Sequence, residues 1–237
     1  SMGVSDYILK LTMTPEDMEK ILETMAYPNN AVGTLLNRGT DIFTDNVKSN
    51  VVDEPSFVSR KEREFWRFIW DSQMFNEGGG GEDKSFWVSP YERIKGCNLI
   101  LEYVDEMQGD AAKKGHMKGE AYALRGYYYF MLVNLYGEPY NYNKQALGVP
   151  LKLTADMETN GTARSTVEEV YKQIVSDLKA ASDLFEKYPK RRGSYRINLP
   201  TTNILLSRVY LHMELWDDAI AAATKAIENG GVLTNYV

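Results

Sequence analysis

Carboxylates are the most numerous side chains in this chain that could take part in chemistry. The sequence contains 33 aspartate and glutamate residues, against two histidines and one cysteine. A glycosidase needs two carboxylates held about 5 to 10 Å apart. Asp45, Asp53 and Glu54 lie in a stretch expected to be a loop, but nothing around them marks a catalytic pair. We therefore expect no enzyme activity.

Nucleophilic catalysis and metal binding have equally little support. Cys97 stands alone in an apolar context, where a buried, inert thiol is expected. His116 and His212 are far apart, lack the spacing of a zinc site and have no evident partner. The Gly-x-Ser-x-Gly motif of many hydrolases does not occur in the sequence. The sequence thus predicts neither a metal site nor a cofactor.

Composition and charge narrow the classes of partner. The net charge is −6, and apolar residues make up 43% of the chain, which is ordinary for a globular protein. An acidic chain gives nucleic acid no electrostatic attraction. No run of about 18 apolar residues indicates a membrane span. We expect a folded protein that binds no nucleic acid.

Helical periodicity dominates the chain. Thr14, followed by Pro15 and two acidic residues, is expected to cap a first short helix, and Ser165 with Glu168 has the spacing of a capping box. Apolar residues at intervals of three to four predict further helices over residues 29–37, 91–107, 116–136, 166–187, 200–213 and 216–228. No convincing strand pattern is present. The predicted fold class is therefore mainly α.

The segment GEAYALRGYYYFMLVNLYGEPY, residues 119–140, is apolar on almost every side. A surface helix has one apolar stripe, so this helix is expected to be covered by neighbours. A glycine within a helix costs about 1 kcal/mol relative to alanine. Gly119, Ala123 and Gly126 are therefore expected to let another helix come close. Glu120 and Arg125 are expected to be structural ion-pair or capping groups.

Three stretches lack helical periodicity: residues 38–56, 76–85 and 137–164. The second contains four consecutive glycines, which suit neither a helix nor a stable strand. The third is rich in Pro, Gly and Asn, and loops of this length within a compact domain are usually functional. Trp66 and Trp70 are interleaved with apolar residues, and we expect both in the core.

The C-terminal part has the pattern of a helical repeat. LLSRVYLHMELWDDAIAAATKAI, residues 205–227, fits the tetratricopeptide half-repeat, and the predicted helices come in pairs joined by short turns. These features indicate a tetratricopeptide-like helical repeat array with long loops. An array cut between repeats exposes the face that its neighbour would cover. We therefore expect exposed apolar residues on helix 216–228, Ile220 and Ile227 among them, and a tendency to self-associate.

Several of these segments resemble one family. FWVSPYERIKGCNLIL carries Trp87, Tyr91, Ile94 and Asn98 at the places of the W-x3-Y-x2-I-x3-N block of SusD-like (RagB/SusD) proteins. Residues 119–140 resemble the family's Gly-Glu-Ala-x2-Leu-Arg helix with its Tyr-Gly ending, and GVPL at 148–151 resembles the element that follows. The resemblance is continuous over residues 85–236, whereas residues 1–84 agree only in general layout.

The resemblance implies a single SusD-like N-terminal helical domain over residues 1–237. Residues 1–84 would form N-terminal helices and long loops, and residues 85–237 tetratricopeptide-like helix pairs. The family implies a lipid-anchored protein on the external face of a Gram-negative outer membrane. It captures oligosaccharides, or in some branches peptides, and acts as a lid on a SusC-like TonB-dependent transporter. The chain is expected to be truncated at its C-terminus relative to the family, and the lipid-acceptor cysteine is not in it.

Candidate ligand-binding residues follow from the same resemblance. The segment before the Trp-x3-Tyr helix contributes an aromatic residue to the family's sugar platform, which indicates Trp87, with Phe86 beside it. Packing at the start of the helix is the alternative role for Trp87. Asp45 and Asn46, in the first long loop, are candidates for hydrogen bonds to sugar hydroxyls. The competing functions are a tetratricopeptide protein-interaction scaffold and an enzyme.

Overall fold

The computed structural model describes residues 13–27, 85–156, 161–190 and 196–230, together with residues 58, 62, 65, 66 and 68–72. The chain forms two compact units. One consists of residues 28–90, and the other, here called the helical unit, combines residues 1–27 with residues 91–237. The helix expected over residues 29–37 lies outside the described residues.

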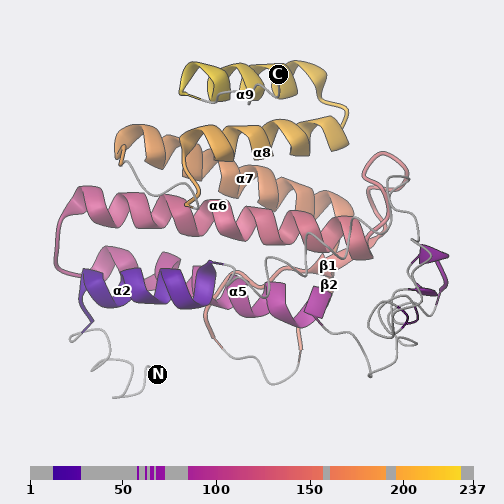
Figure 1. Ribbon diagram of the computed structural model, residues 1–237, viewed down its shortest axis with the longest axis horizontal. Helices are drawn as coiled ribbons and strands as arrows, with labels where there is room; N and C mark the ends of the chain where they lie inside the picture. The colour runs from indigo at the N-terminus through magenta and orange to yellow at the C-terminus, as the bar shows by residue number, and fades with distance from the viewer. Residues whose placement is uncertain are drawn as a thin grey trace. The chain divides into compact units, whose positions relative to one another are not determined.

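The described elements are mostly helices, which confirms the mainly α fold class (Figure 1). In chain order they are α2 (Pro15–Ile21), the π-helical turn η1 (Leu22–Ala26), α5 (Ser85–Tyr103), the 3-10 turn η2 (Val104–Glu106), α6 (Ala111–Tyr136), strands β1 (Leu147–Pro150) and β2 (Arg164–Thr166), α7 (Val167–Lys187), α8 (Leu199–His212) and α9 (Trp216–Glu228).

Two helices begin earlier than their apolar pattern predicts. Helix α5 starts at Ser85 rather than at residue 91, and Pro90 lies inside it. Proline lacks the N–H that bonds to the preceding turn, which is why the pattern placed the boundary there. Helix α6 starts at Ala111, where the Asp110 carboxylate accepts hydrogen bonds from two backbone N–H groups. In α6, periodicity marks the covered part of the helix and misses its exposed first residues.

A short antiparallel sheet of β1 and β2 was not expected from the sequence. Strands of three and four residues are too short to show an alternating pattern. Ser165 lies extended within β2, so the cap of α7 moves to Thr166. The Thr166 hydroxyl accepts from the Glu169 N–H, and the Glu169 carboxylate accepts from the Thr166 N–H. The predicted capping box of Ser165 and Glu168 is therefore wrong by one residue.

Helices α6, α7, α8 and α9 pack in succession, each on the one before it (Figure 1). Helix α5 runs antiparallel to α6, because Tyr91 contacts Tyr129 while Asn98 bonds to Arg125. A hydrogen bond between the side chains of Ser182 and Asn203 joins α7 to α8. Consecutive helices thus pack on one another, as the predicted repeat pattern requires.

Glycines set the closest helix contacts. A Cβ added at Gly126 would lie 3.0 Å from Cγ of Leu178, and one at Gly119 would lie 3.1 Å from the ring of Phe185. Both neighbours belong to α7, which confirms that this face of α6 meets another helix. At Gly96 of α5 an added Cβ would lie 2.7 Å from the backbone carbonyl carbon of Met25. The turn η1 therefore approaches α5 backbone to backbone.

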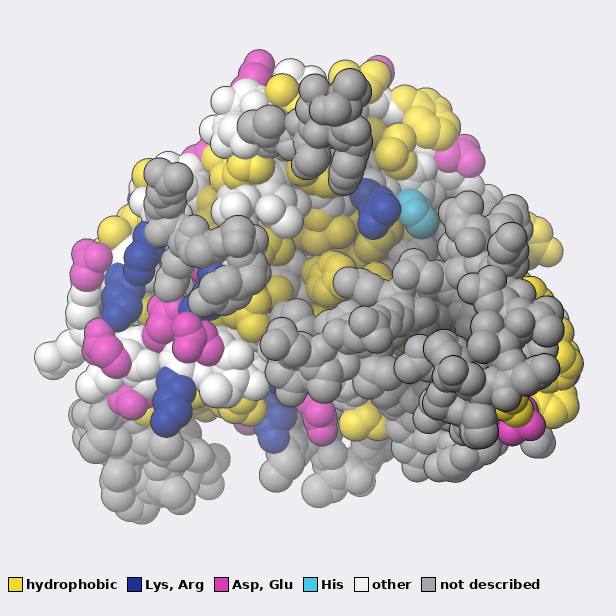
Figure 2. Space-filling model, viewed as in Figure 1, with side chains coloured by type: hydrophobic (Ala, Val, Ile, Leu, Met, Phe, Trp, Pro, Cys, Tyr) yellow, Lys and Arg dark blue, Asp and Glu magenta, His cyan; other side chains and the backbone are white. Residues whose placement is uncertain are grey.

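Helix α9 has two different apolar faces. Ala219, Ala222 and Ala226 are buried, and the Ala219 carbonyl accepts a hydrogen bond from a serine hydroxyl of α8. Ile220 and Ile227 are 65% and 66% exposed, as predicted. Figure 2 shows hydrophobic side chains gathered beside the start of this helix.

Candidate functional site

The predicted ligand-binding residues lie at the start of α5 and in the first long loop. Trp87 is in the first turn of α5 and is partly buried. Phe86, beside it, is 1% exposed, so a ligand could reach its ring only if the covering residues moved. Asp45 and Asn46 lie outside the described residues. Trp87 thus keeps part of its side chain accessible to a ligand.

Later residues of α5 form hydrogen bonds with the end of β1 and with the backbone that follows it. The Tyr91 hydroxyl donates to the Pro150 carbonyl at 2.8 Å. The Asn98 amide donates to the carbonyls of Lys152 and Thr154, at 3.0 Å each. These contacts tie α5 to the backbone of residues 150–154. The motif residues Tyr91 and Asn98 therefore have structural roles.

Arg125 and Asp177 form a buried ion pair between α6 and α7. Two nitrogens of the Arg125 guanidinium donate to the two Asp177 oxygens at 2.7 Å each, and a third donates to Asn98 at 2.9 Å. Burial raises the pKa of Asp177, and the hydrogen bonds from Arg125 offset only part of that change. Burial by itself would lower the pKa of Arg125, but the hydrogen bonds and charge of Asp177 outweigh it and raise that pKa. The predicted structural role of Arg125 is confirmed.

A second cluster of charged side chains surrounds Arg196. One guanidinium nitrogen lies 2.6 Å from carboxylate oxygens of both Glu19 and Glu23, and another lies 3.1 Å from Glu120. Nε2 of His116 lies 3.4 Å from the other Glu120 oxygen, so the expectation that His116 lacks a partner is wrong. Glu120, His116 and Arg196 are almost completely buried. These contacts join α2 to α6 and to the segment before α8, which gives the cluster a structural role.

The aromatic segment over residues 65–70 is the surface that sequence reasoning missed. Trp70 is 65% exposed, and Phe65 and Phe68 are each nearly half exposed, whereas Trp66 is partly buried. The φ angle of Trp70 is +57°, in the left-handed region that bulky residues rarely adopt. The core position expected for Trp70 is wrong. Apolar residues spread through a segment do not show which of its faces is covered. The signal available in the sequence was a high density of aromatic residues in a segment that lacks helical periodicity.

The described residues offer little support for other kinds of site. Among the residues that the structure describes, no group of three His, Cys, Asp or Glu side chains could hold a metal ion. Cys97 is fully buried, and burial raises the pKa of its thiol. No helix in the described part of the chain is long and apolar enough to cross a membrane. The accessible chemistry is that of aromatic ring faces, which bind apolar ligand surfaces.

Comparison with known proteins matches this chain to one family. Residues 4–211 match the model of a SusD-like family described as "Starch-binding associating with outer membrane". A search of curated protein sequences gives no match.

Solved structures share the fold. A putative sugar binding protein from Bacteroides vulgatus is 31% identical, with a TM-score of 0.73 over 91% of this chain and 46% of that chain. A SusD-like carbohydrate binding protein from the same organism is 24% identical, with a TM-score of 0.74 over 94% of this chain and 46% of that one. A laminarin binding SusD-like protein is 22% identical, with a TM-score of 0.60 and coverage of 99% and 45%. This chain thus spans about half the length of these solved chains.

Proposed function

This chain belongs to the SusD-like family, and we propose that it binds oligosaccharides at the cell surface without altering them. The bound oligosaccharide is then delivered to a SusC-like TonB-dependent transporter. A lipid anchor holds the native protein on the external face of the outer membrane. The family description, which names both starch binding and the outer membrane, supports this assignment.

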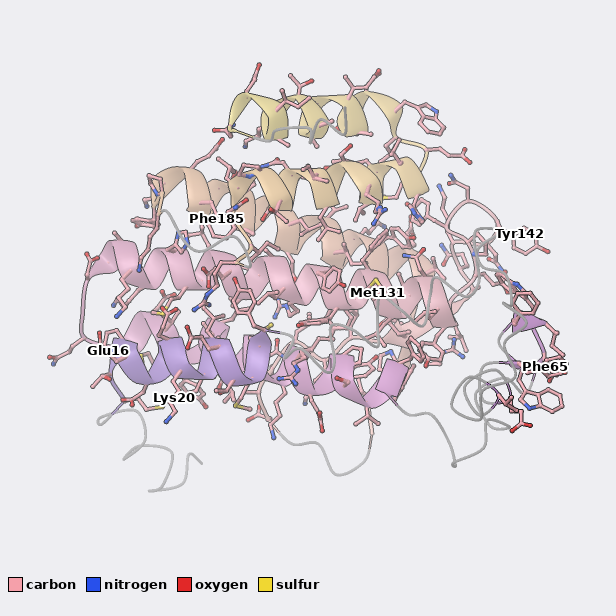
Figure 3. The ribbon with its side chains drawn as sticks, in the orientation of Figure 1. Glu16, Lys20, Phe65, Met131, Tyr142 and Phe185 are labelled. Carbon is pink, nitrogen blue, oxygen red and sulfur yellow. The ribbon has the colours of Figure 1, made fainter. Side chains whose placement is uncertain are left out.

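Exposed aromatic rings in the unit of residues 28–90 carry the proposal. A sugar ring has an apolar C–H face that packs on an aromatic ring, and its hydroxyls need a few fixed polar partners. Phe65, Phe68 and Trp70 present their side chains to solvent within one short segment. Phe65 is labelled in Figure 3. Exposed apolar groups of this kind are typical of binding surfaces.

The predicted ligand residues extend this surface. Trp87, at the start of α5, belongs to the same unit and supplies a further partly accessible ring. Phe86 is buried and joins the site only if the residues that cover it move. Asp45 and Asn46 offer a carboxylate and an amide for hydrogen bonds to sugar hydroxyls.

The apolar face of α9 favours a second candidate function, that of a protein-interaction scaffold. Trp216, Ile220 and Ile227 are exposed at the spacing of one helical stripe. Such a stripe is suited to contact with an amphipathic helix. Capture of a peptide by the aromatic rings of residues 65–70 is the remaining alternative.

Affinity electrophoresis in gels that contain soluble starch or laminarin tests the proposal, and a panel of immobilised polysaccharides widens the search. We expect one of these polysaccharides to retard the wild-type protein. Trp70→Ala and Trp87→Ala should each weaken this binding by about tenfold, the usual effect of losing an aromatic anchor. Trp216→Ala is the matched control, because it removes an exposed tryptophan from α9 and should leave binding unchanged.

Thermal unfolding separates a ligand contact from a packing residue. Each variant should keep a nearly unchanged melting temperature if its ring faces solvent. A Trp87→Ala protein that melts many degrees lower but binds polysaccharide normally would make Trp87 a packing residue. A wild-type protein that binds peptides and no polysaccharide would replace oligosaccharide capture by peptide capture. Protein binding that depends on Ile220 would instead support the scaffold function.

A further inference from the structure

The connection between α6 and β1, residues 137–146, has no role in the function proposed above. It belongs to the long stretch that the sequence marked as functional. Tyr142, near its middle, is 81% exposed, the highest value among the exposed large hydrophobic side chains that the structure describes. Figure 3 shows Tyr142 beyond the end of α6, with its side chain directed away from the helices.

Backbone hydrogen bonds give this exposed connection a fixed shape. The N–H groups of Tyr142 and Asn143 donate to the Pro139 carbonyl at 3.0 and 3.4 Å. The N–H of Glu168 donates to the Lys144 carbonyl at 2.9 Å, which ties the connection to the first turn of α7. A ligand that binds here need not order the backbone, and this lowers the cost of binding.

Tyr140 anchors the connection to the helices. Its side chain is buried, and its ring centre lies 4.8 Å from that of Tyr171 in α7. The Lys144 ammonium lies 4.7 Å from the centre of the Tyr140 ring. Two residues further on, Tyr142 is exposed instead. One tyrosine therefore fixes the connection while the next presents its ring to solvent.

Side chains that can form hydrogen bonds flank Tyr142 in the sequence. Asn141, Asn143, Lys144 and Gln145 are all exposed. Amide groups donate and accept hydrogen bonds, as sugar hydroxyls do. The side-chain oxygen of Asn143 accepts from the Gln145 N–H at 3.2 Å, which restricts how that amide can turn. An exposed ring with exposed amides next to it in the sequence offers groups for both the apolar and the polar parts of a sugar ring.

We propose that residues 137–146 form a carbohydrate contact centred on Tyr142, where the apolar C–H face of one neutral sugar unit packs on the tyrosine ring. This contact rests on the proposed function and lies on the helical unit, whereas the aromatic segment of residues 65–70 belongs to the other unit. A tyrosine side chain has few torsions to fix, so its ring is ordered at low entropic cost. A single ring on an open surface recognises a sugar face rather than a particular linkage.

The test uses the whole chain in affinity electrophoresis with starch, laminarin and the polysaccharide panel. Tyr142→Ala should weaken binding by about fivefold, as expected for one aromatic contact at an open surface. Tyr142→Phe should bind like the wild type, because the contact needs the ring and not the hydroxyl. Trp216→Ala, which removes an exposed ring elsewhere on the helical unit, should also bind normally. All three variants should keep the wild-type melting temperature, since their side chains are exposed.

Four other results would contradict the Tyr142 contact, each in a different way. Wild-type binding that Tyr142→Ala leaves unchanged overturns the contact and leaves the proposed function standing. An equal loss in the Ala and Phe variants assigns the effect to the hydroxyl and overturns ring packing. A change in sedimentation without a change in polysaccharide binding makes Tyr142 a protein contact. A wild-type protein that binds no polysaccharide overturns the proposed function and this contact together.

Discussion

Replacing Asp177 by alanine should destabilise the helical unit far more than any exposed substitution on α7. Arg125 would lose both of its 2.7 Å hydrogen bonds and stay buried as a cation without its counter-charge. Gln173 would lose an acceptor as well, because its amide donates to Asp177 at 2.8 Å. The Asn98 side-chain oxygen would still accept from Arg125, but it carries no charge to replace the carboxylate.

The expected loss follows from the burial of the pair. Removing one partner of a buried ion pair costs about 3 to 5 kcal/mol, because the other charge has neither water nor counter-ion. The side chains of Arg125 and Asp177 are only 7% and 2% exposed, so the full effect applies. A loss of 1 kcal/mol lowers the melting temperature by about 2 to 4 °C in a chain of this size. Asp177→Ala should therefore melt about 6 to 20 °C below the wild type.

Urea unfolding followed by circular dichroism measures the free energy of unfolding directly. Asp183→Ala is the matched control, since Asp183 is an exposed aspartate on the same helix. It should change the free energy by no more than about 0.5 kcal/mol. A double variant, Arg125→Met with Asp177→Leu, removes both charges. It should lose less stability than Asp177→Ala alone, because no unpaired charge stays buried.

Two results would refute this reasoning. If Asp177→Ala loses no more stability than Asp183→Ala, water or neighbouring groups must already stabilise Arg125, and the pair does not hold α6 to α7. If the double variant is less stable than Asp177→Ala, an unpaired Arg125 costs less than replacing both charged side chains with apolar ones. The desolvation argument would then be wrong for this pair.

Three further predictions concern packing, pH dependence and the face of α9. Gly96→Ala should lower the free energy of unfolding in urea by about 1 to 3 kcal/mol, because its methyl group meets the backbone of η1. Gly126→Ala meets a leucine side chain and should cost less, so the opposite order would contradict the packing argument. Hydrogen bonds with the threonine cap lower the pKa of Glu169 in the folded state, so the stability it adds is present at neutral pH and is lost below about pH 4. Urea titrations at stepped pH should show a smaller acid-induced loss for Glu169→Gln, and an unchanged profile would rule out this contribution. Ile220→Lys combined with Ile227→Lys should reduce self-association in sedimentation velocity, and identical profiles for variant and wild type would argue against an adhesive α9 face.

Helix identity and the close helix contacts could be predicted from the sequence because their causes are local. Apolar residues at intervals of three to four mark a covered face, whatever covers it. Gly119 and Gly126 lie within one such pattern, where glycine is explained by a close neighbour, and α7 is that neighbour. The exposed stripe with Ile220 and Ile227 was predictable for the same reason, since both faces of α9 are encoded within its own residues.

The candidate site was less predictable, because exposure of an aromatic ring depends on segments elsewhere in the chain. Phe86 and Trp70 both lie among apolar residues, yet one is buried and the other is exposed. Trp87 became a candidate through the family resemblance, and its role as a ligand contact stays a prediction. Tyr140 and Tyr142 also have similar sequence surroundings, and only the packing of Tyr140 on α7 separates them.

The sequence by itself determined which helices form and which of their faces are apolar. The tertiary structure decided which charges meet. Arg196 and Glu19 are 177 positions apart, and Arg125 and Asp177 are 52 apart. The sequence predicts a structural role for Arg125, but it does not identify the partner, because 33 acidic residues offer many possible ones. Arg196, Glu19 and Asp177 resemble ordinary surface charges in the sequence. Burial of a charge is tolerated only where a partner compensates the lost water, and that compensation exists only once distant segments have packed together.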